Sequence, residues 1–317
     1  MIRLLLVGLG RQGTRHLRVA GRTAGLAVAA TVDPHAPGTG EVPHFDKLDD
    51  ALDAGSYDAA VVATPTPEHA AAVRSLVEAR IPMLVEKPMA IDVPEAEELA
   101  VMAASAGVLL AVGFVERFNP AVSVVSAMLR RGSLGRPICM NFRRLGLPPA
   151  QSPGVDVIHD LAVHDIDVFK LLAGRGVILA GVNGWPAGGP SEAAHLLLQA
   201  GSVNGSVHAN WKTPVRVRDF SVTTDTCYVE ANYTTQQVEV VEPHEPAELV
   251  EYGDFQSHYG TARRVQLDLL RAEPLARELE AFADAVRGEI SPLLALADDG
   301  VAAVAIADAA TARLRHG

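Results

Sequence analysis

The sequence is poor in cysteine and in positive charge, and it has no long apolar run. Its 317 residues include two cysteines, Cys139 and Cys227, too few for a disulfide framework, which is typical of a reducing cytoplasm. A formal net charge of −11 argues against a nucleic-acid partner, since a polyanion would be repelled. No apolar run reaches the length of about 18 residues that a membrane-spanning helix needs. The short apolar start MIRLLLVGLG is typical of a first strand rather than a signal peptide. We therefore expect a cytoplasmic protein without a membrane partner.

Length and composition predict two globular domains. Hydrophobic residues make up 49% of the chain and charged residues 21%, a balance typical of folded proteins. The length is about twice that of a usual domain. The pattern of elements changes after residue 118, so we expect one domain over 1–118 and a second over 119–317.

The first 118 residues alternate short apolar runs with helical patterns, which predicts a parallel sheet wound with helices on both faces. The expected strands are 2–7, 27–32, 59–63, 83–85 and 108–112, and the expected helices are 11–24, 47–54, 68–80 and 95–106.

The segment VGLGRQGTRH follows the first expected strand and opens the first helix. Gly8, Gly10 and Gly13 have the G-x-G-x-x-G spacing, in which the glycines allow a tight turn, close approach of a pyrophosphate and close helix packing. Asp33 ends the second strand, where a carboxylate binds the adenosine ribose. Because Asp33 would repel a 2′-phosphate and no arginine follows it, the pattern favours NAD over NADP. The intervening Arg11 and Gln12 join the expected cofactor-binding set.

Two further segments follow strands at the edge of the sheet where ligands bind in such folds. In VVATPTPEHA, Thr64 and Pro65 are expected to line the cofactor site, with His69 in the same set, although an ordinary turn explains this segment equally well. In MLVEKPMA, Glu86 and Lys87 follow a strand that ends at Val85 and join the expected cofactor-binding set, and Lys87 is expected to project towards the nicotinamide. A lysine at such a place is more commonly just solvated.

The segment GVDVIHDLAVHDIDVFKLLAG at 154–174 predicts a helix with a polar stripe. At about 100° per residue, Asp160, His164 and Asp167 share one face, while His159 and Asp165 point elsewhere. His159, Asp165 and Asp167 are expected in supporting or surface roles. Alone, this stripe is more typical of a solvated helix face. Asp160 and His164 have the spacing of metal ligands but lack an evident third ligand, so we expect no metal.

After residue 118 the pattern predicts an α/β domain with a mostly antiparallel sheet. The expected strands are 137–143, 177–183, 193–199, 203–210, 215–224, 226–232 and 235–241, with helices at 119–131, 275–287 and 300–315. So few helices leave one face of the sheet open, which predicts a homodimer or homotetramer through that face. Arg117 and Asn119 are candidate substrate ligands, although a salt bridge within the core explains Arg117 equally well. Arg143 is a candidate for a diphosphate, although a surface ion pair is at least as common for such an arginine.

As an ordered set, the segments VGLGRQGTRH, ATPTPEHA, VEKP, VGFVERFNPAV and DLAVHDIDVFKLL resemble those of the glucose–fructose oxidoreductase and inositol dehydrogenase (Gfo/Idh/MocA) family of sugar oxidoreductases. The resemblance implies a Rossmann domain followed by an α/β domain with a large open sheet that forms the oligomer interface. Its E-K-P lysine corresponds to Lys87, and its D-x-x-x-H pair corresponds to Asp160 and His164. Within the family the chain looks most like members that oxidise C3 of UDP-N-acetylglucosamine. Other branches act on inositols, sugar phosphates or deoxysugar nucleotides, and 241–260 departs most from the pattern.

Oxidation of a secondary alcohol needs a hydride acceptor and a base for the hydroxyl proton. NAD fits the first need, and His164 is our expected base, with Lys87 hydrogen-bonded to the reacting oxygen. The reverse assignment of Lys87 and His164 stays open. Asp160 is expected to bind a neighbouring hydroxyl or to orient the imidazole. A non-catalytic dinucleotide sensor is the alternative from another class.

Overall fold

The structure is a computed structural model that describes residues 1–38, 40–148, 156–174, 176–186, 190–243, 249–252, 255–258 and 262–316. Side chains are not described for 249–252, 255–258 and 316. The chain divides into two units: unit 1 comprises Met1–Phe118 and Ala272–Ala309, and unit 2 comprises Asn119–Arg271 and Ala310–Gly317.

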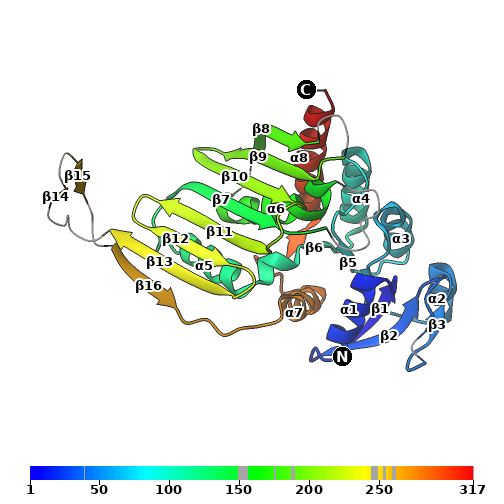
Figure 1. Cartoon of the computed structure of the whole chain (residues 1–317). Coiled ribbons are helices and arrows are strands. Elements are labelled where there is room, and N and C mark those ends of the chain that lie inside the picture. The colour runs from blue at the N-terminus through cyan, green and yellow to red at the C-terminus, as the bar shows by residue number, and fades with distance from the viewer. Residues whose placement is uncertain are drawn as a thin grey trace. The chain divides into compact units, whose positions relative to one another are not determined.

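Unit 1 is a doubly wound α/β unit, as the sequence predicts. Its described residues form a seven-stranded sheet in the order β17-β6-β5-β4-β1-β2-β3, parallel except for β17 (Figure 1). The order reverses at β1 and β4, the point at which open α/β sheets bind ligands. The strands are β1 (Ile2–Val7), β2 (Leu26–Val32), β3 (His44–Phe45), β4 (Ala59–Val62), β5 (Met83–Glu86), β6 (Leu110–Gly113) and β17 (Ala295–Leu296). The helices are α1 (Arg11–Ala20), α2 (Leu48–Ala54), α3 (Thr66–Glu78), α4 (Val93–Ala106), the 3₁₀-helix η1 (Val115–Phe118) and α7 (Pro274–Val286).

The end of the chain differs from the predicted division at one point. The boundary after Phe118 falls where we expected it, but residues 272–309 return to unit 1. The physical reason is apolar packing, since Leu279 and Phe282 of α7 are fully buried in the core that also holds Leu4 and Val61. β17 adds an antiparallel edge to β6. Helix α8 (Ala297–His316) then runs from unit 1 into unit 2. Local hydrophobic periodicity predicts the helix itself but not which of the two cores a helix near the end of the chain packs into.

Unit 2 contains the predicted mostly antiparallel sheet, with more strands than we expected. Its described residues form an eight-stranded sheet in the order β16-β13-β12-β11-β7-β10-β9-β8, in which β7 and β10 are the parallel pair. β16 was not predicted. The strands are β7 (Pro137–Leu145), β8 (Val177–Trp185), β9 (Ala193–Ala200), β10 (Val203–Asn210), β11 (Val217–Thr224), β12 (Tyr228–Asn232), β13 (Gln237–Pro243) and β16 (Ala262–Leu267). A separate hairpin joins β14 (Leu249–Tyr252) and β15 (Phe255–His258).

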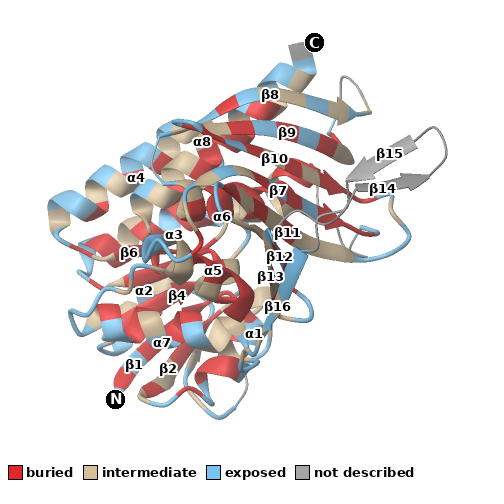
Figure 2. Cartoon of the chain, turned by 90° about the vertical axis from the view of Figure 1, so that its left-hand side faces the viewer, coloured by how far each residue is buried: buried red, intermediate tan, exposed pale blue. Residues whose placement is uncertain are grey.

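The two faces of this sheet differ in burial (Figure 2). Helices α5 (Pro120–Arg130) and α6 (Val163–Ala173) cover one face, where Phe142 stacks on Phe220 and meets Phe169 of α6 edge-on. Alternate residues on the other face are exposed or half-buried, including His195, which stacks on His208 of the neighbouring strand. A half-solvated sheet is what alternating polarity predicts. Assembly through this face stays a prediction.

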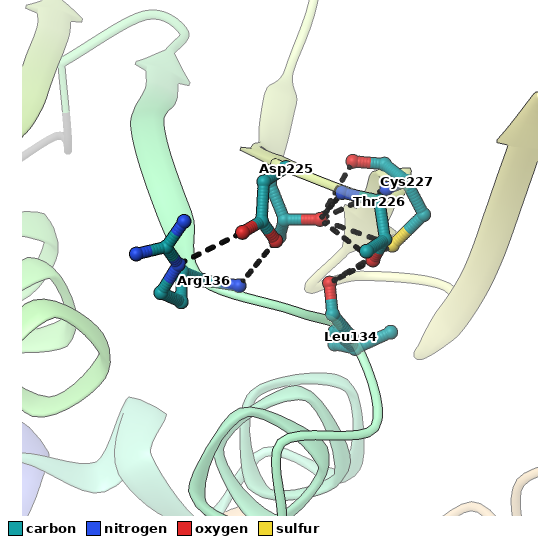
Figure 3. A network of polar contacts seen from close by, with 6 residues as sticks. Leu134, Arg136, Asp225, Thr226 and Cys227 are labelled. Atoms are coloured by element: carbon teal, nitrogen blue, oxygen red, sulfur yellow. Dashed lines mark hydrogen bonds and ion pairs between the residues drawn. The ribbon is translucent and has the colours of Figure 1, made fainter.

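The TTDT segment at 223–226 forms the tight connection between antiparallel strands β11 and β12. Asp225 accepts hydrogen bonds from the backbone N–H of Arg136 at 2.7 Å and from its Nε at 2.9 Å (Figure 3). These contacts lower the pKa of Asp225, the side-chain bond from Arg136 contributing most. The thiol of Cys227 lies 3.4 Å from the carbonyl oxygen of Leu134 (Figure 3). Both cysteines are free thiols, and this one helps to tie the turn to the start of β7.

The predicted helix at 154–174 begins with a wide turn. Residues 154 and 155 lie outside the described residues, and Ile158–Ala162 forms a π-helix, η2, before α6 begins at Val163. A π-turn winds more slowly than the 100° per residue that we assumed for the stripe through Asp160, His164 and Asp167. Asp160 and His164 are half-buried, whereas Asp167 is buried. Such turns are common at functional sites.

Candidate active site

The glycine motif lies between β1 and α1, and its three glycines face different surroundings. A Cβ at Gly13 would lie 1.8 Å from the carbonyl oxygen of Gly8, so the helix packs on the loop at a distance that only glycine allows. A Cβ at Gly8 would lie 2.7 Å from backbone atoms of Ala63 and Thr64. A Cβ at Gly10 would meet nothing within 4 Å. The open space is therefore at Gly10, the N-cap of α1, where helix N–H groups favour a phosphate.

Asp33 follows β2 and is bound to the same loop. Its carboxylate accepts hydrogen bonds from the backbone N–H groups of Leu9 at 2.7 Å and of His35 and Ala36 at 2.8 Å. Burial opposes ionisation, but these bonds outweigh it and lower the pKa of Asp33. The group is thus a fixed carboxylate beside the glycine loop, as ribose binding requires. Pro34 and His35 beside it are exposed.

Thr64 and Lys87 lie at the same edge of the sheet as the glycine loop. Parallel strands β1, β4 and β5 are neighbours, and Gly8, Thr64 and Lys87 each come within two residues of a strand's carboxyl end. Oγ1 of Thr64 is shielded from solvent and has no hydrogen-bond partner among the described residues. Lys87 is half-buried, while Pro65 and Arg11 are exposed. A buried hydroxyl without a partner fits a position that a ligand completes.

Glu86 and Gln12, both predicted to bind the cofactor, contact protein groups in the structure, and their predicted role stays a prediction. Nε2 of His16 lies 2.8 Å from Oε1 of Glu86, and Nε2 of Gln12 donates to the same oxygen at 3.3 Å. Glu86 and His16 are both buried. Burial opposes the charge on Glu86, but the hydrogen bond and charge of His16, followed by the charges of Lys87 and His69, lower its pKa. We did not single out His16 from the sequence, although it lies three residues after Gly13.

His69 also uses both of its ring nitrogens within the protein. Nε2 lies 3.0 Å from the carbonyl oxygen of Thr64 and Nδ1 lies 3.0 Å from that of Pro88. The ring is 1% exposed. Burial lowers the pKa of His69 more than these carbonyls raise it. The predicted cofactor-binding role of His69 therefore stays a prediction, while its observed contacts join two loops at the edge of the sheet.

In unit 2, η2 and α6 position the predicted acid–base residues. Asp160 lies in η2 and His164 in the first turn of α6, and both are half-buried. Asp165 and Asp167, for which we expected supporting or surface roles, are 0% and 1% exposed. The polar residues of this segment therefore divide into half-buried and fully buried groups.

The buried group is held by strands distant in sequence. Arg144 of β7 forms a paired hydrogen bond with Asp165, from Nη2 at 2.8 Å and from Nε at 3.0 Å. The hydroxyl of Tyr233 donates to Oδ1 of Asp165 at 3.0 Å, and the Arg144 guanidinium lies over the Tyr233 ring. Neither Arg144 nor Tyr233 was predicted to take part, and local spacing carries no signal for such pairs.

His159 is bound to Asp156 at the start of the segment. Nδ1 of His159 lies 2.8 Å from Oδ1 of Asp156, which also accepts from the backbone N–H groups of Ile158 and His159. Oγ1 of Thr311 donates to Oδ2 at 2.9 Å. Burial opposes ionisation of Asp156, but the contacts with His159 and Thr311 lower its pKa. Asp156 thus anchors the first turn of η2 to the last turns of α8.

Three predicted substrate ligands make structural contacts. Arg143 points to the open face of the sheet, opposite the face of Arg144 and α6, and pairs with Asp219 at 2.7 and 2.8 Å. Successive strand residues alternate faces, which explains this separation. Arg117 is buried and pairs with Asp299 at 3.2 Å. Asn119 caps α5 and donates to the carbonyl of Tyr233 at 3.0 Å.

The described residues contain no group of three or more candidate ligands that could hold a metal ion. No helix within the described part of the chain is long and apolar enough to cross a membrane.

Comparison with known proteins shows which families and solved structures this chain is similar to. Residues 2–114 match the family described as "Oxidoreductase family, NAD-binding Rossmann fold" (GFO_IDH_MocA). The rhizopine catabolism protein MocA of Rhizobium meliloti is 32% identical over 55% of this chain and 57% of its own length. Inositol 2-dehydrogenase of Mycolicibacterium smegmatis is 32% identical over 54% of this chain and 52% of its own length. These alignments thus span little more than half the length of either relative.

A solved structure extends the similarity in fold to the whole chain. UDP-N-acetylglucosamine 3-dehydrogenase of Acidithiobacillus ferrooxidans superposes with a TM-score of 0.83 over 99% of this chain and 98% of its own, at 23% identity. The two-domain fold that we predicted is therefore confirmed. The family match covers residues 2–114, most of the first segment of unit 1, and agrees with the Gfo/Idh/MocA resemblance of the sequence.

Proposed function

We propose that this protein is an NAD-dependent dehydrogenase that oxidises a secondary hydroxyl of a sugar or cyclitol ring. The observation that carries the proposal is the common edge of unit 1, where open space at Gly10, the buried Thr64 hydroxyl and Lys87 follow neighbouring strands. The named dehydrogenases among the relatives support the same reaction class.

The residues present fit a dinucleotide. Helix α1 offers its N–H groups to the pyrophosphate at Gly10, and Asp33 is a fixed carboxylate for the ribose hydroxyls. Asp33 would repel a 2′-phosphate, and the residues that follow it, Pro34 and His35, do not include an arginine that could bind such a phosphate. We therefore propose NAD rather than NADP. When bound, NAD supplies the hydride acceptor.

The proton chemistry is assigned to residues of both units. In the proposal His164 accepts the hydroxyl proton, and Lys87 donates a hydrogen bond to the same oxygen and stabilises its developing negative charge. Asp160 binds a neighbouring hydroxyl or orients the imidazole. Glu86 supports this choice, since its buried negative charge favours the charged form of Lys87, which donates but does not accept a proton.

UDP-N-acetylglucosamine, oxidised at C3, is our first substrate candidate because the sequence segments resemble those enzymes and the matched structure carries that name. One observation favours a second candidate, a free inositol. Arg143, the expected diphosphate ligand, lies on the sheet face opposite α6 and is already paired with Asp219. A cyclitol has no diphosphate and does not need that arginine.

The test is NADH formation with UDP-N-acetylglucosamine, myo-inositol and hexose phosphates, each with NAD and with NADP. Lys87→Ala should lower kcat by at least about 10³-fold while NAD still binds, because both the hydrogen bond and the charge at the reacting oxygen are lost. Lys47→Ala, at an exposed lysine of unit 1, is the matched control and should keep full activity. NAD binding without turnover of any substrate would favour the non-catalytic sensor, and a Lys87→Ala variant with near-normal kcat would remove Lys87 from the mechanism.

A further inference from the structure

Glu86, which precedes Lys87 in the chain, belongs to a set of four polar side chains that do not react in the proposed chemistry; three of them are buried and Gln12 is half-buried. The set consists of His16 and Gln12 of α1, Glu86 of β5 and His69 of α3. Two of these four act on the loop that carries Lys87. Glu86 precedes Lys87 and contacts His16, and His69 contacts Pro88, which follows Lys87.

Glu86 is fixed before Lys87 in the chain. Its Oε1 takes a 2.8 Å contact from His16 and a 3.3 Å bond from Gln12. Nδ1 of His16 has no partner among the described residues, so Nε2 is the nitrogen that carries the proton donated to Glu86. The neighbouring strand makes room for the carboxylate, since a Cβ at Gly113 would lie 3.4 Å from Oε2 of Glu86. A side chain at position 113 would press on this pair.

His69 is fixed after Lys87 in the chain. It contacts the carbonyl oxygen of Pro88 through Nδ1 and that of Thr64 through Nε2, both at 3.0 Å. Thr64 follows β4 and Pro88 follows β5, so one imidazole joins the two loops that flank the proposed nicotinamide end. Both ring nitrogens lie against backbone carbonyl oxygens, and a neutral ring donates its single N–H to one of them.

The charges of the set act on the lysine itself. Glu86 is a buried carboxylate, and the hydrogen bond from His16 and the charge of Lys87 both stabilise its ionised form. The attraction is mutual, so the carboxylate draws the Lys87 ammonium towards the end of β5 and favours its charged state. Burial makes this attraction stronger than it would be at the surface.

We propose that His16, Glu86 and His69 form a buried positioning network that holds Lys87 in place and charged, rather than a set of cofactor ligands. Glu86 supplies the charge, His16 holds the carboxylate, and His69 fixes the two adjoining loops. This inference rests on the proposed dehydrogenase function for its kinetic consequence, but the network can also be detected in the resting protein.

The kinetic experiment compares His69→Leu with His69→Gln. The leucine removes both contacts, and a misplaced lysine should lower kcat by about 10²-fold. Glutamine carries two N–H donors on one nitrogen, so we expect it to restore kcat to within about tenfold of wild type. The dissociation constant of NAD should change less than threefold in both variants. Thermal unfolding measures the loss of stability in each variant. His44→Gln is the control variant, because His44 is half-buried in unit 1 and is hydrogen-bonded to Thr31 rather than to the loop of Lys87.

A second variant, Glu86→Gln, separates charge from hydrogen bonding. The amide oxygen still accepts from His16, but the negative charge is gone, so we expect kcat to fall at least tenfold with an unchanged affinity for NAD. If His69 or Glu86 binds the cofactor directly, the variants should bind NAD more weakly but turn over at the wild-type rate once NAD is saturating. That result overturns the proposal. Equal losses in the leucine and glutamine variants that follow their loss of thermal stability overturn it as well.

A measurement without turnover distinguishes failure of this inference from failure of the proposed function. Reductive methylation with isotopically labelled formaldehyde at pH 7, read by peptide mass spectrometry, reports the reactivity of each lysine amine. Glu86→Gln should raise the labelling rate of Lys87 at least threefold and leave exposed Lys47 unchanged. An unchanged rate at Lys87 overturns the network, whether or not a substrate has been found.

Discussion

The openings of helices α1 and α6 present two different ways of building a polar site. At α1 the site is made by backbone, since Gly10 faces open space while Gly8 and Gly13 are closed in by their neighbours. At α6 the site begins with a π-turn, and most of the nearby charge is consumed by partners from other elements, as in the pair of Arg144 and Asp165. The site at α1 is determined by the local spacing of residues, and the site at α6 is determined by contacts between residues distant in sequence.

The difference determines which substitutions each region tolerates. At α1 the glycines matter because they have no side chain. A methyl group added at Gly13 should therefore disturb folding, and one added at Gly10 should disturb ligand binding. At α6 the critical quantity is the balance of buried charge, so removing one partner leaves the other unpaired. The predictions below test the comparison from the largest expected effect to the smallest.

Gly13→Ala should have the largest effect. Its Cβ would lie 1.8 Å from the carbonyl oxygen of Gly8, so we expect unit 1 to lose more than about 3 kcal/mol of stability, beyond the usual cost of overpacking. Gly10→Ala is the matched control, because its Cβ meets nothing within 4 Å. Thermal unfolding should be unchanged for Gly10→Ala, whereas NAD affinity by fluorescence titration should fall at least tenfold. A stable Gly13→Ala protein that binds NAD normally would contradict the backbone origin of this site.

Asp165→Ala should destabilise unit 2 by about 3–5 kcal/mol, because it leaves the buried Arg144 guanidinium and the Tyr233 hydroxyl without their shared acceptor. Urea unfolding followed by circular dichroism measures the loss. The double variant Arg144→Met with Asp165→Leu should be more stable than Asp165→Ala alone, since the guanidinium is then not left buried without the Asp165 carboxylate. A loss below about 1 kcal/mol for Asp165→Ala would place this pair among ordinary surface contacts.

The parts of the molecule that local sequence spacing controls were predicted well. The parallel sheet, the glycine loop and Asp33 beside it lie as expected, because hydrophobic period and turn chemistry act over a few residues. The open face of the second sheet also follows from alternation along each strand.

The parts that depend on distant partners were not predicted. The face on which Arg143 lies depends on the register of β7, and one position separates it from buried Arg144. The π-turn η2 departs from the α-helical geometry with which we drew the polar stripe, and no local pattern in the sequence predicted it. His16 could have been found, since it lies on the buried face of α1, but its partner Glu86 is 70 residues away.

Asp156→Asn tests the anchor of η2 through pH. The folded-state pKa of Asp156 is lowered from 3.8, so its charge stabilises the protein above that pH and this contribution is lost as the pH falls through and below it. We expect the variant to lose about 1–2 kcal/mol at pH 7, and the difference from wild type to shrink as the pH approaches 3. Chemical unfolding at a series of pH values measures it. A difference that stays constant down to pH 3 would show that the ionisation of Asp156 contributes nothing.

Arg143→Ala should have the smallest effect and completes the contrast with Arg144. The Arg143 side chain is 59% exposed and pairs with Asp219, so its loss should cost about 0.2–1 kcal/mol. Its charge reaches His208 on the same face, whose pKa is lowered by burial first and then by His195 and Arg143. Removing the guanidinium should therefore raise the pKa of His208 in an NMR titration, while dehydrogenase kcat and KM stay at wild-type values. A large rise in KM for a nucleotide sugar would instead return Arg143 to the substrate site and contradict the separation of the two sheet faces.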